Sequence, residues 1–346
     1  MNPKRIIFIA EDLSFPIDEG MKKYNYFLLH YLKTHFSDFV LFTLKDNDLT
    51  DKSEIINNKS FVSLKLFLKI RKFNPRLVIY SPSSSGTLLS FIRLFIIKLA
   101  SLKSETIIIN LQRRHHSRAA KAIIKLIKPR FVVVFSKKDR DYYNSMKIDT
   151  LPGKAGVDLN RFIPVNKTKK EELRRKYGFN EFDKIVLHIG HIKESRNISV
   201  LKSLSGEGYQ VLLVGSTSTA QDMHLKYDLE KSGIKILDSY ISQIEEIYQL
   251  SDIYVFPVIN DNSAVEFPLS VLEAMSCNLP VVTTSYGSLP DYFDQSECFT
   301  YFSSKKELHK QVGNALRSVS ENREVVLMKF SWEGIFDELF HSINKS

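Results

Sequence analysis

Two glutamates flank the start of an apolar helical pattern in the stretch "SAVEFPLSVLEAMSC", where Glu266 comes before Pro268 and Glu273 follows five residues after it. Proline suits the first position of a helix, so the N–H groups of Leu269 and Ser270 would face outward at its positive end. Such a helix end binds anions, phosphate among them. Glu273 could accept two hydrogen bonds from a vicinal diol, as acidic residues do for a nucleotide ribose. The pattern indicates a nucleotide site, and a capping role for both glutamates remains the alternative.

The elements around this stretch alternate between short apolar runs and longer helical patterns. The runs are nearly all apolar, which is typical of parallel strands covered on both faces. This βαβ rhythm predicts an α/β fold. The predicted strands are Arg5–Ala10, Phe39–Thr43, Leu77–Tyr80, Thr106–Asn110 and Phe131–Phe135, then Lys184–Ile189, Gln210–Val214, Ile234–Leu237, Ile253–Pro257 and Pro280–Thr284.

The rhythm pauses once, in "LPGKAGVDLNRFIPVNKTKK" from Leu151 to Lys170, which carries Pro, Gly and charge without a sustained period. We interpret it as the junction between two Rossmann-like domains. The predicted first domain spans 1–160 together with a last helix at about 330–346, and the second spans 161–329. Open α/β sheets bind ligands beyond the carboxyl ends of their strands, so we expect both domains to offer loops to a cleft between them.

Composition limits the partners. The 346 residues carry a formal net charge of +10, which favours an anionic partner such as nucleic acid, an acidic membrane surface or a phosphorylated ligand. The two cysteines, Cys277 and Cys298, form no disulfide framework and favour a reducing, cytoplasmic compartment. The opening "MNPKRIIFIAED" has too short an apolar run for a signal peptide, and no window reaches the length of a membrane span.

Four further stretches, read together with "EFPLSVLEAMSCNLPVVTT", resemble glycosyltransferase family four, the retaining GT-B enzymes. "GVDLNRFIP" resembles the family's junction signature, and "IGHIKESRNISVL" resembles its diphosphate-binding loop. "IEEIYQLSDIYVFPV" resembles the helix and strand before the acidic motif, and "FSWEGIFDELF" resembles a closing helix that crosses back to the first domain. The resemblance covers nearly the whole chain and is most secure from Gly156 onward. It implies a GT-B fold, a nucleoside diphosphate-sugar as substrate, and neither a cofactor nor a metal.

In the second domain the resemblance implies a diphosphate site. Arg196 takes the place of the family's lysine and is expected to stabilise the departing diphosphate, with Gly190 and His191 beside it; a solvated surface arginine is the alternative. Phe267, Pro268, Leu269 and Ser270 match the acidic motif, and Glu273 matches its ribose acceptor.

This chain departs from the family pattern at the first acidic position, which is occupied by Val265. Glu266 stands one place later, where we expect it to reach the donor sugar or diphosphate as a catalytic residue; a structural role is the alternative.

The first domain matches the family less well. Gly20 is expected at a helix start near the donor phosphate, with an ordinary turn glycine as the alternative. Gln112 stands where the family often has a cleft histidine, and His115 or His116 could replace it, unless both lie in an exposed basic loop.

These observations predict a glycosyltransferase that moves a sugar from a nucleoside diphosphate-sugar to an acceptor hydroxyl, with retention. A glycan or lipid-linked acceptor and peripheral contact with an anionic membrane are expected from the apolar and basic segments Thr87–Lys103 and Ala119–Arg130. The alternative for those segments is that they only cover the sheet while their cations are solvated. The alternative function is a non-catalytic relative that binds a nucleotide-sugar or a partner protein. An epimerase on the same fold fits the landmarks less well, and no nucleic-acid recognition module accompanies the charge.

Overall fold

The computed structural model describes residues 5–44, 49, 53–56, 63–217 and 220–345. The chain forms two compact units, of which the first comprises residues 1–154, 265–267 and 333–346, and the second comprises residues 155–264 and 268–332. The chain therefore leaves the second unit twice, once for only three residues and once for its C-terminal helix. The domain limits expected from the sequence differ from these bounds by a few residues and stay a prediction.

The first unit contains a seven-stranded parallel sheet in the order β3-β2-β1-β4-β5-β6-β7. Its strands are β1 (Ile6–Ala10), β2 (Phe39–Thr43), β3 (Ser53–Ile55), β4 (Leu77–Ser81), β5 (Glu105–Asn110), β6 (Phe131–Val134) and β7 (Thr150–Pro152). The order reverses between β1 and β4, so the loops that follow these two strands begin at a switch point where open sheets bind ligands.

The second unit contains a six-stranded parallel sheet in the order β10-β9-β8-β11-β12-β13. Its strands are β8 (Ile185–Gly190), β9 (Gln210–Gly215), β10 (Lys235–Leu237), β11 (Ile253–Phe256), β12 (Val281–Thr283) and β13 (Phe299–Tyr301). Its switch point lies between β8 and β11. The predicted α/β fold with two parallel sheets is confirmed.

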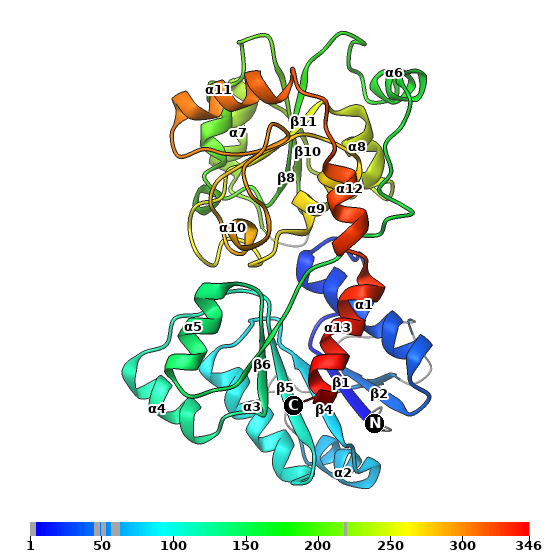
Figure 1. The fold of residues 1–346 in the computed structure, drawn as a ribbon, viewed down its shortest axis with the longest axis vertical. Coiled ribbons are helices and arrows are strands. Elements are labelled where there is room, and N and C mark those ends of the chain that lie inside the picture. The colour runs from blue at the N-terminus through cyan, green and yellow to red at the C-terminus, as the bar shows by residue number, and fades with distance from the viewer. Residues whose placement is uncertain (1–4, 45–48, 50–52, 57–62, 218–219, 346) are drawn as a thin grey trace. The chain divides into compact units, whose positions relative to one another are not determined.

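Helices cover both sheets (Figure 1). Those of the first unit are α1 (Gly20–His35), α2 (Leu64–Phe73), α3 (Leu88–Ala100), α4 (Arg118–Leu126), α5 (Lys137–Ser145) and, from residue 333 on, α13 (Trp332–Lys345). Those of the second are α6 (Lys167–Lys176), the 3₁₀ helices η1 (Glu194–Arg196) and η2 (Ile198–Ser203), α7 (Met223–Lys231), α8 (Ile244–Leu250), α9 (Leu269–Ser276), α10 (Leu289–Tyr292), α11 (Lys305–Ala315) and α12 (Asn322–Lys329).

Side-chain caps explain where many of these helices begin. Ser, Thr, Asn or Asp oxygens accept a hydrogen bond from the amide three residues on, which satisfies a donor that the helix itself leaves open. The capping residues are Ser63, Thr87, Ser117, Ser136, Asn166, Asp222 and Ser304. In contrast, α9 begins after Pro268 without a side-chain cap.

The buried strand residues pack against apolar helix faces in each unit. In the first unit, one core cluster joins alternate residues of β1 and β4 to α2, α3 and α4. In the second, β8, β9 and β11 pack in the same way against η2, α7 and α11. Each cluster takes every second residue of these strands, and the strand residues in between are buried as well. Both faces of each sheet are therefore covered.

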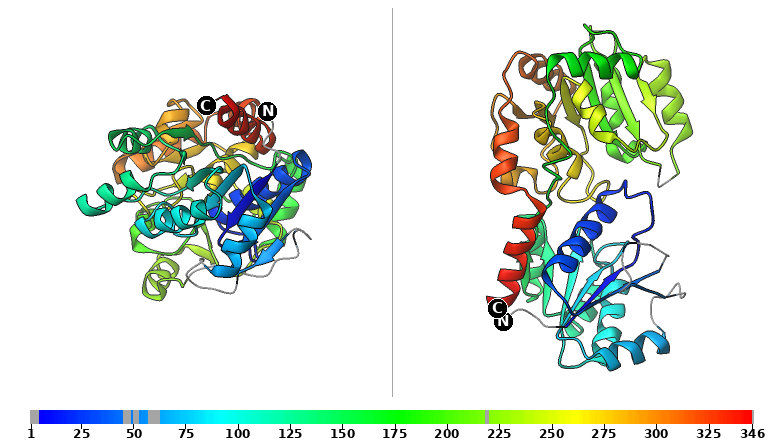
Figure 2. Two further views of the ribbon diagram at one scale, coloured as in Figure 1. Left: turned by 90° about the horizontal axis from the view of Figure 1, so that it is seen from below. Right: turned by 90° about the vertical axis from the view of Figure 1, so that its right-hand side faces the viewer.

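Helix α13 packs on α1 within the first unit, as both views show (Figures 1 and 2). The Phe340 ring stacks on Tyr31 with centroids 5.4 Å apart, and Phe336 meets Tyr24 edge-on at 5.5 Å. The Tyr31 hydroxyl donates to Asp337 at 2.7 Å. These contacts anchor the C-terminal helix to the first unit, as the resemblance implied.

Two elements in the predicted junction escaped sequence reasoning. Helix α6 carries nine charged or polar residues in "KTKKEELRRK" around a single apolar one, Leu173, so it has no apolar period to detect. Strand β7 ends in Pro152 at the edge of its sheet, a place that tolerates proline because no further strand needs its amide.

Candidate functional site

The loop after β8 in the second unit carries three of the predicted site residues. Gly190 ends the strand, His191 follows, and Arg196 closes the short helix η1. Arg196 is 9% exposed, so it is not the solvated surface arginine of the alternative interpretation. A Cβ added at Gly190 would collide with Nη1 of Arg196, so glycine is required for the guanidinium to lie against the backbone here.

The amino end of α9 lies near this loop, and Tyr254 of β11 shows it. Its buried hydroxyl lies 3.5 Å from the carbonyl oxygen of Ile189, just before Gly190, and the Ser270 side chain lies close enough to lower the pKa of the phenol. Burial raises the pKa of this phenol, the charge of Glu273 raises it further, and the charge of Arg196 lowers it, so both residues lie near the ring. The structure therefore brings the diphosphate-loop residues and the helix end together, around a tyrosine that sequence reasoning did not single out.

Glu273 lies inside α9 and is 4% exposed. Its Oε2 accepts a hydrogen bond of 2.7 Å from the hydroxyl of Tyr248, on α8. Burial, followed by the Glu273 charge, raises the pKa of Tyr248 well above its usual value, so the phenol stays protonated and donates. Tyr248 thereby orients the carboxylate, which sequence spacing alone did not reveal.

The histidines of this loop are electrically neutral near pH 7. Burial, with help from Arg196 and Lys193, lowers the pKa of His191 to about 4. Burial also lowers the pKa of His188, within β8, to about 3, and Arg196 adds to this effect. The positive charge of the loop therefore comes from arginine and lysine rather than from imidazolium.

Glu266 lies in the first unit with Val265 and Phe267. It is fully buried, its amide donates to the Leu111 carbonyl at 2.7 Å, and its Oε2 accepts from Nη2 of Arg113 at 3.1 Å. Nε of the same guanidinium donates to Asp139 at 2.7 Å. This placement favours the structural alternative for Glu266, and its catalytic role stays a prediction.

Gly20 is the first residue of α1, at the helix start where the sequence placed it.

An acidic residue that sequence reasoning did not single out, Glu11, lies near the switch point of the first sheet. It follows β1 and is 3% exposed. It accepts from the Tyr80 hydroxyl, from Nη1 of Arg93 at 2.8 Å and from the Ser83 hydroxyl at 2.7 Å. In the sequence, the only signal for Glu11 is its position directly after the apolar run Ile6–Ala10.

The histidine pair of the first unit divides into an exposed residue, His115, and a half-buried one, His116. Nε2 of His116 lies 2.8 Å from the Gly86 carbonyl, which can only accept, so this nitrogen carries the proton. Nδ1 then accepts from the Tyr142 hydroxyl at 2.8 Å. Both ring nitrogens of His116 are therefore engaged within the protein. Gln112 uses its side-chain oxygen to accept from Arg114 at 2.9 Å.

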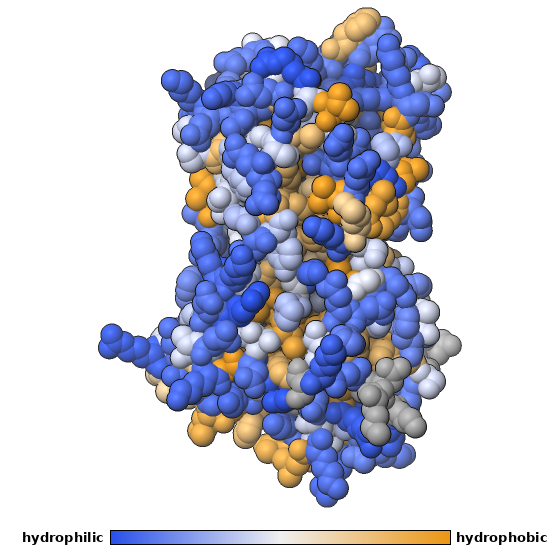
Figure 3. Space-filling model, viewed as in Figure 1, coloured by the Kyte–Doolittle hydropathy of each residue, from blue (hydrophilic) through white to orange (hydrophobic). Residues whose placement is uncertain are grey.

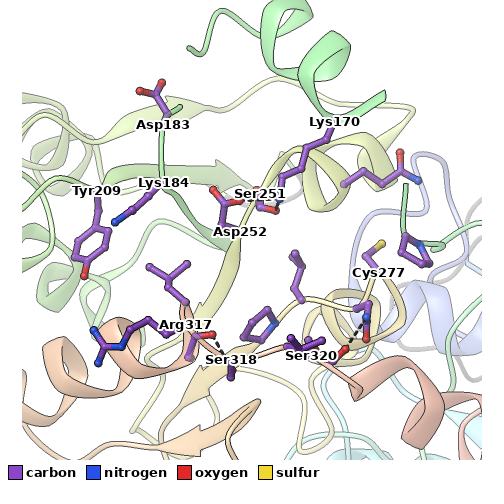
Figure 4. Close-up of a pocket in the computed structure, with 18 of the residues that line it drawn as sticks. Lys170, Asp183, Lys184, Tyr209, Ser251, Asp252, Cys277, Arg317, Ser318 and Ser320 are labelled. Carbon is purple, nitrogen blue, oxygen red and sulfur yellow. Dashed lines mark hydrogen bonds and ion pairs between the residues drawn. The ribbon is translucent and has the colours of Figure 1, made fainter. Parts of the chain in front are cut away.

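A separate pocket of about 660 Å³ lies in the second unit, where residues at the amino ends of its strands line it (Figure 4). Lys170 donates there to Asp252 at 2.7 Å, and Arg174 donates to the same carboxylate at 2.6 Å. These cations tie α6 to the start of β11. Since the diphosphate loop follows the opposite, carboxyl end of β8, this pocket is distinct from the candidate site.

Within the described part of the chain, no group of three or more His, Cys, Asp or Glu side chains could hold a metal ion. Among the same residues, no helix has the length and apolarity needed to cross a bilayer.

Comparison with protein families matches residues 169–327 to the model described as "Glycosyl transferases group 1". Among curated proteins, the chain is 29% identical over 150 residues to the sulfoquinovosyl transferase SQD2 of Arabidopsis thaliana, covering 41% of this chain and 27% of that protein. It is 25% identical over 224 residues to a D-inositol 3-phosphate glycosyltransferase of Geodermatophilus obscurus, covering 58% of this chain and 48% of the relative. The matches thus span between about a quarter and a half of these relatives' lengths.

Solved structures extend the likeness to the whole fold. HepE from Anabaena in complex with UDP superimposes with a TM-score of 0.79 at 13% identity, covering 99% of this chain and 100% of that one. The sucrose-phosphate synthase of Thermosynechococcus elongatus superimposes with a TM-score of 0.75 at 16% identity, covering 99% of each chain. At such identities the likeness concerns the fold alone.

Proposed function

We propose that this chain, whose residues 169–327 match the model of the glycosyl transferases group 1, transfers a sugar from a nucleoside diphosphate-sugar to an acceptor hydroxyl with retention of configuration. The predicted GT-B fold is confirmed by the likeness of nearly the whole chain to the structures of HepE and of the sucrose-phosphate synthase. The observation that carries the proposal is a cluster in the second unit. Arg196 lies against Gly190, and the Tyr254 hydroxyl reaches the neighbouring Ile189 carbonyl. Glu273 of α9 is held nearby by Tyr248.

In this proposal the second unit holds the donor. The first-turn amides of α9 and the guanidinium of Arg196 bind the diphosphate, and Arg196 stabilises the negative charge that develops as this group departs. Glu273, oriented by Tyr248, accepts from the ribose hydroxyls. HepE, whose structures contain UDP and UDP-glucose, supports a donor of this class.

We assign Glu266 to anchoring rather than to the reaction, because its carboxylate is buried against Arg113. The position where the family usually has a glutamate is occupied here by the uncharged Val265. Retaining transfer then depends on a held donor and an aligned acceptor hydroxyl, with a donor phosphate oxygen receiving the proton.

The first unit is proposed to contact an anionic membrane that carries a lipid-linked or cell-envelope acceptor. Leu126, at the end of α4, is 84% exposed, and the same helix carries the exposed cations Arg118 and Lys125; Leu102, after α3, is 72% exposed. Figure 3 shows apolar groups among hydrophilic ones on the visible face of this unit. Apolar side chains set among cations suit an interface between lipid headgroups and acyl chains.

The function is tested by donor turnover. Purified protein is incubated with a panel of UDP-, GDP-, ADP- and dTDP-sugars, and release of the nucleoside diphosphate is followed with and without lipid extracts as acceptor. We expect one donor class to be consumed, and Arg196→Ala to lower its turnover strongly. Tight binding of a nucleotide-sugar without any turnover would favour the non-catalytic alternative, and absence of both would overturn the donor site.

A further inference from the structure

His188 is an unusual residue for the middle of a parallel strand, because it places a polar ring where the side chain is fully buried. Its Nδ1 lies 2.9 Å from the carbonyl oxygen of Val255 on the neighbouring strand. A carbonyl can only accept, so Nδ1 carries the proton. In the neutral ring Nε2 is then a bare acceptor.

That acceptor has no hydrogen-bond donor in the part of the chain that the structure describes. Leaving a buried acceptor without a donor costs stability, and native proteins rarely do so. The nearest rings, those of Tyr254 and Phe256, have centroids 6.4 and 6.3 Å from the imidazole. The phenol of Tyr254 is already directed at Ile189 and Ser270. Tyr254 is therefore not placed to serve as the donor for Nε2.

Gly190 shows which group faces Nε2. A Cβ built on this glycine would stand 3.1 Å from Nε2 of His188 and would collide with Nη1 of Arg196. Both nitrogens therefore lie on the same side of Gly190. One is an acceptor and the other a cationic donor. They make no direct hydrogen bond in this structure, but their common approach to Gly190 leaves them close enough for a small side-chain shift or a single bridging water to join them.

We propose that His188 is a positioning residue for the donor site, whose Nε2 accepts a hydrogen bond from the Arg196 guanidinium, directly or through one water. This contact holds the guanidinium against Gly190 in one orientation, with its remaining donors directed at the diphosphate. An arginine ordered in advance loses less conformational freedom on binding than a mobile one. The inference rests on the proposed function, since it presumes that Arg196 binds the diphosphate.

Two substitutions separate this role from a purely structural one. His188→Asn keeps an N–H that can donate to the Val255 carbonyl but has no atom at the place of Nε2. His188→Gln keeps an acceptor near that place but lacks the donor to Val255. Dissociation constants are measured by calorimetry for UDP, GDP, ADP and dTDP, and the tightest binder of the unaltered protein is used throughout, with thermal unfolding recorded for each variant.

We expect His188→Asn to weaken binding of that nucleotide about tenfold while His188→Gln stays within about threefold, as for one charge-assisted hydrogen bond. The opposite order, with Gln weaker than Asn, would show that the Val255 contact is what matters and would overturn the proposal.

A double-mutant cycle with Arg196→Ala completes the test. If His188 acts through Arg196, His188→Asn has no further effect on nucleotide binding once the guanidinium is gone. Additive losses would overturn the positioning role. If Arg196→Ala alone leaves binding unchanged, the proposed diphosphate site fails, whereas a strong Arg196 effect without a His188→Asn effect overturns only this inference.

Discussion

Arg113 joins two carboxylates inside the first unit, since Nη2 donates to Glu266 at 3.1 Å and Nε donates to Asp139 at 2.7 Å. All three side chains are almost completely buried. One cation thus compensates two acids in a region that water scarcely reaches, which makes the guanidinium the member whose loss matters most.

We predict that Arg113→Leu lowers the free energy of unfolding by about 3–5 kcal/mol, because it leaves two buried carboxylates without their shared cation. Glu266→Gln should cost much less, since Asp139 still pairs with Arg113 and the amide oxygen can still accept. Urea unfolding followed by circular dichroism measures both. Equal losses for the two variants would contradict the central place of Arg113.

The two halves of the nucleotide should be separable by mutation. We predict that Glu273→Gln weakens UDP or GDP binding about tenfold but leaves competition by inorganic pyrophosphate unchanged, because a ribose contact is lost. Arg196→Ala should weaken both ligands. Calorimetric competition gives the two constants, and a Glu273→Gln variant that loses pyrophosphate binding would place the carboxylate elsewhere.

A side chain at Gly190 is predicted to displace the Arg196 guanidinium. Gly190→Ala should lower nucleotide affinity because the new methyl group displaces the Arg196 guanidinium. Gly313→Ala is the matched control, since its Cβ would meet only the Tyr209 hydroxyl at 3.8 Å inside helix α11. That control should stabilise the protein by up to about 1 kcal/mol, as alanine does in helices. Full affinity in Gly190→Ala would contradict the close approach.

The membrane proposal predicts salt-sensitive flotation with vesicles that contain phosphatidylglycerol. Arg118→Glu with Lys125→Glu should abolish it by reversing charge on α4, in the first unit. Lys305→Glu with Lys306→Glu makes the same change on exposed cations of α11, in the second unit, and should leave flotation unchanged. Equal flotation of all three proteins would end the idea that α4 meets the membrane.

Stability should fall on acidification in a window set by the buried histidines. The folded pKa values of His188 and His191 are lowered to about 3 and about 4, so below pH of about 6.5 the unfolded chain takes up protons that the folded chain refuses. The free energy of unfolding therefore decreases as pH falls from about 6.5 toward about 4. Replacing both residues by glutamine should flatten this slope, as urea midpoints across the range would show; an unchanged slope would assign it to other groups.

Local sequence patterns were enough to predict most of the fold and part of the candidate site. Apolar runs predicted the longer strands of both sheets, because a strand buried on both faces needs nothing but its own composition to be seen. Gly20, Pro268 and Arg196 were found at the ends of elements, where spacing along the chain determines position. Strand β7 and helix α6 were missed, since an edge strand with proline and a charged helix lack that local signal.

The amino-acid sequence by itself determined the α/β rhythm, the proline-led helix α9 and the short loop that ends in Arg196. Only the tertiary structure decided that Glu266 pairs with Arg113, that Tyr248 orients Glu273 and that His188 and Arg196 approach the same side of Gly190. The reason is physical: helix and strand periods act between near neighbours, whereas the partner of a buried charge is chosen by packing between residues far apart along the chain.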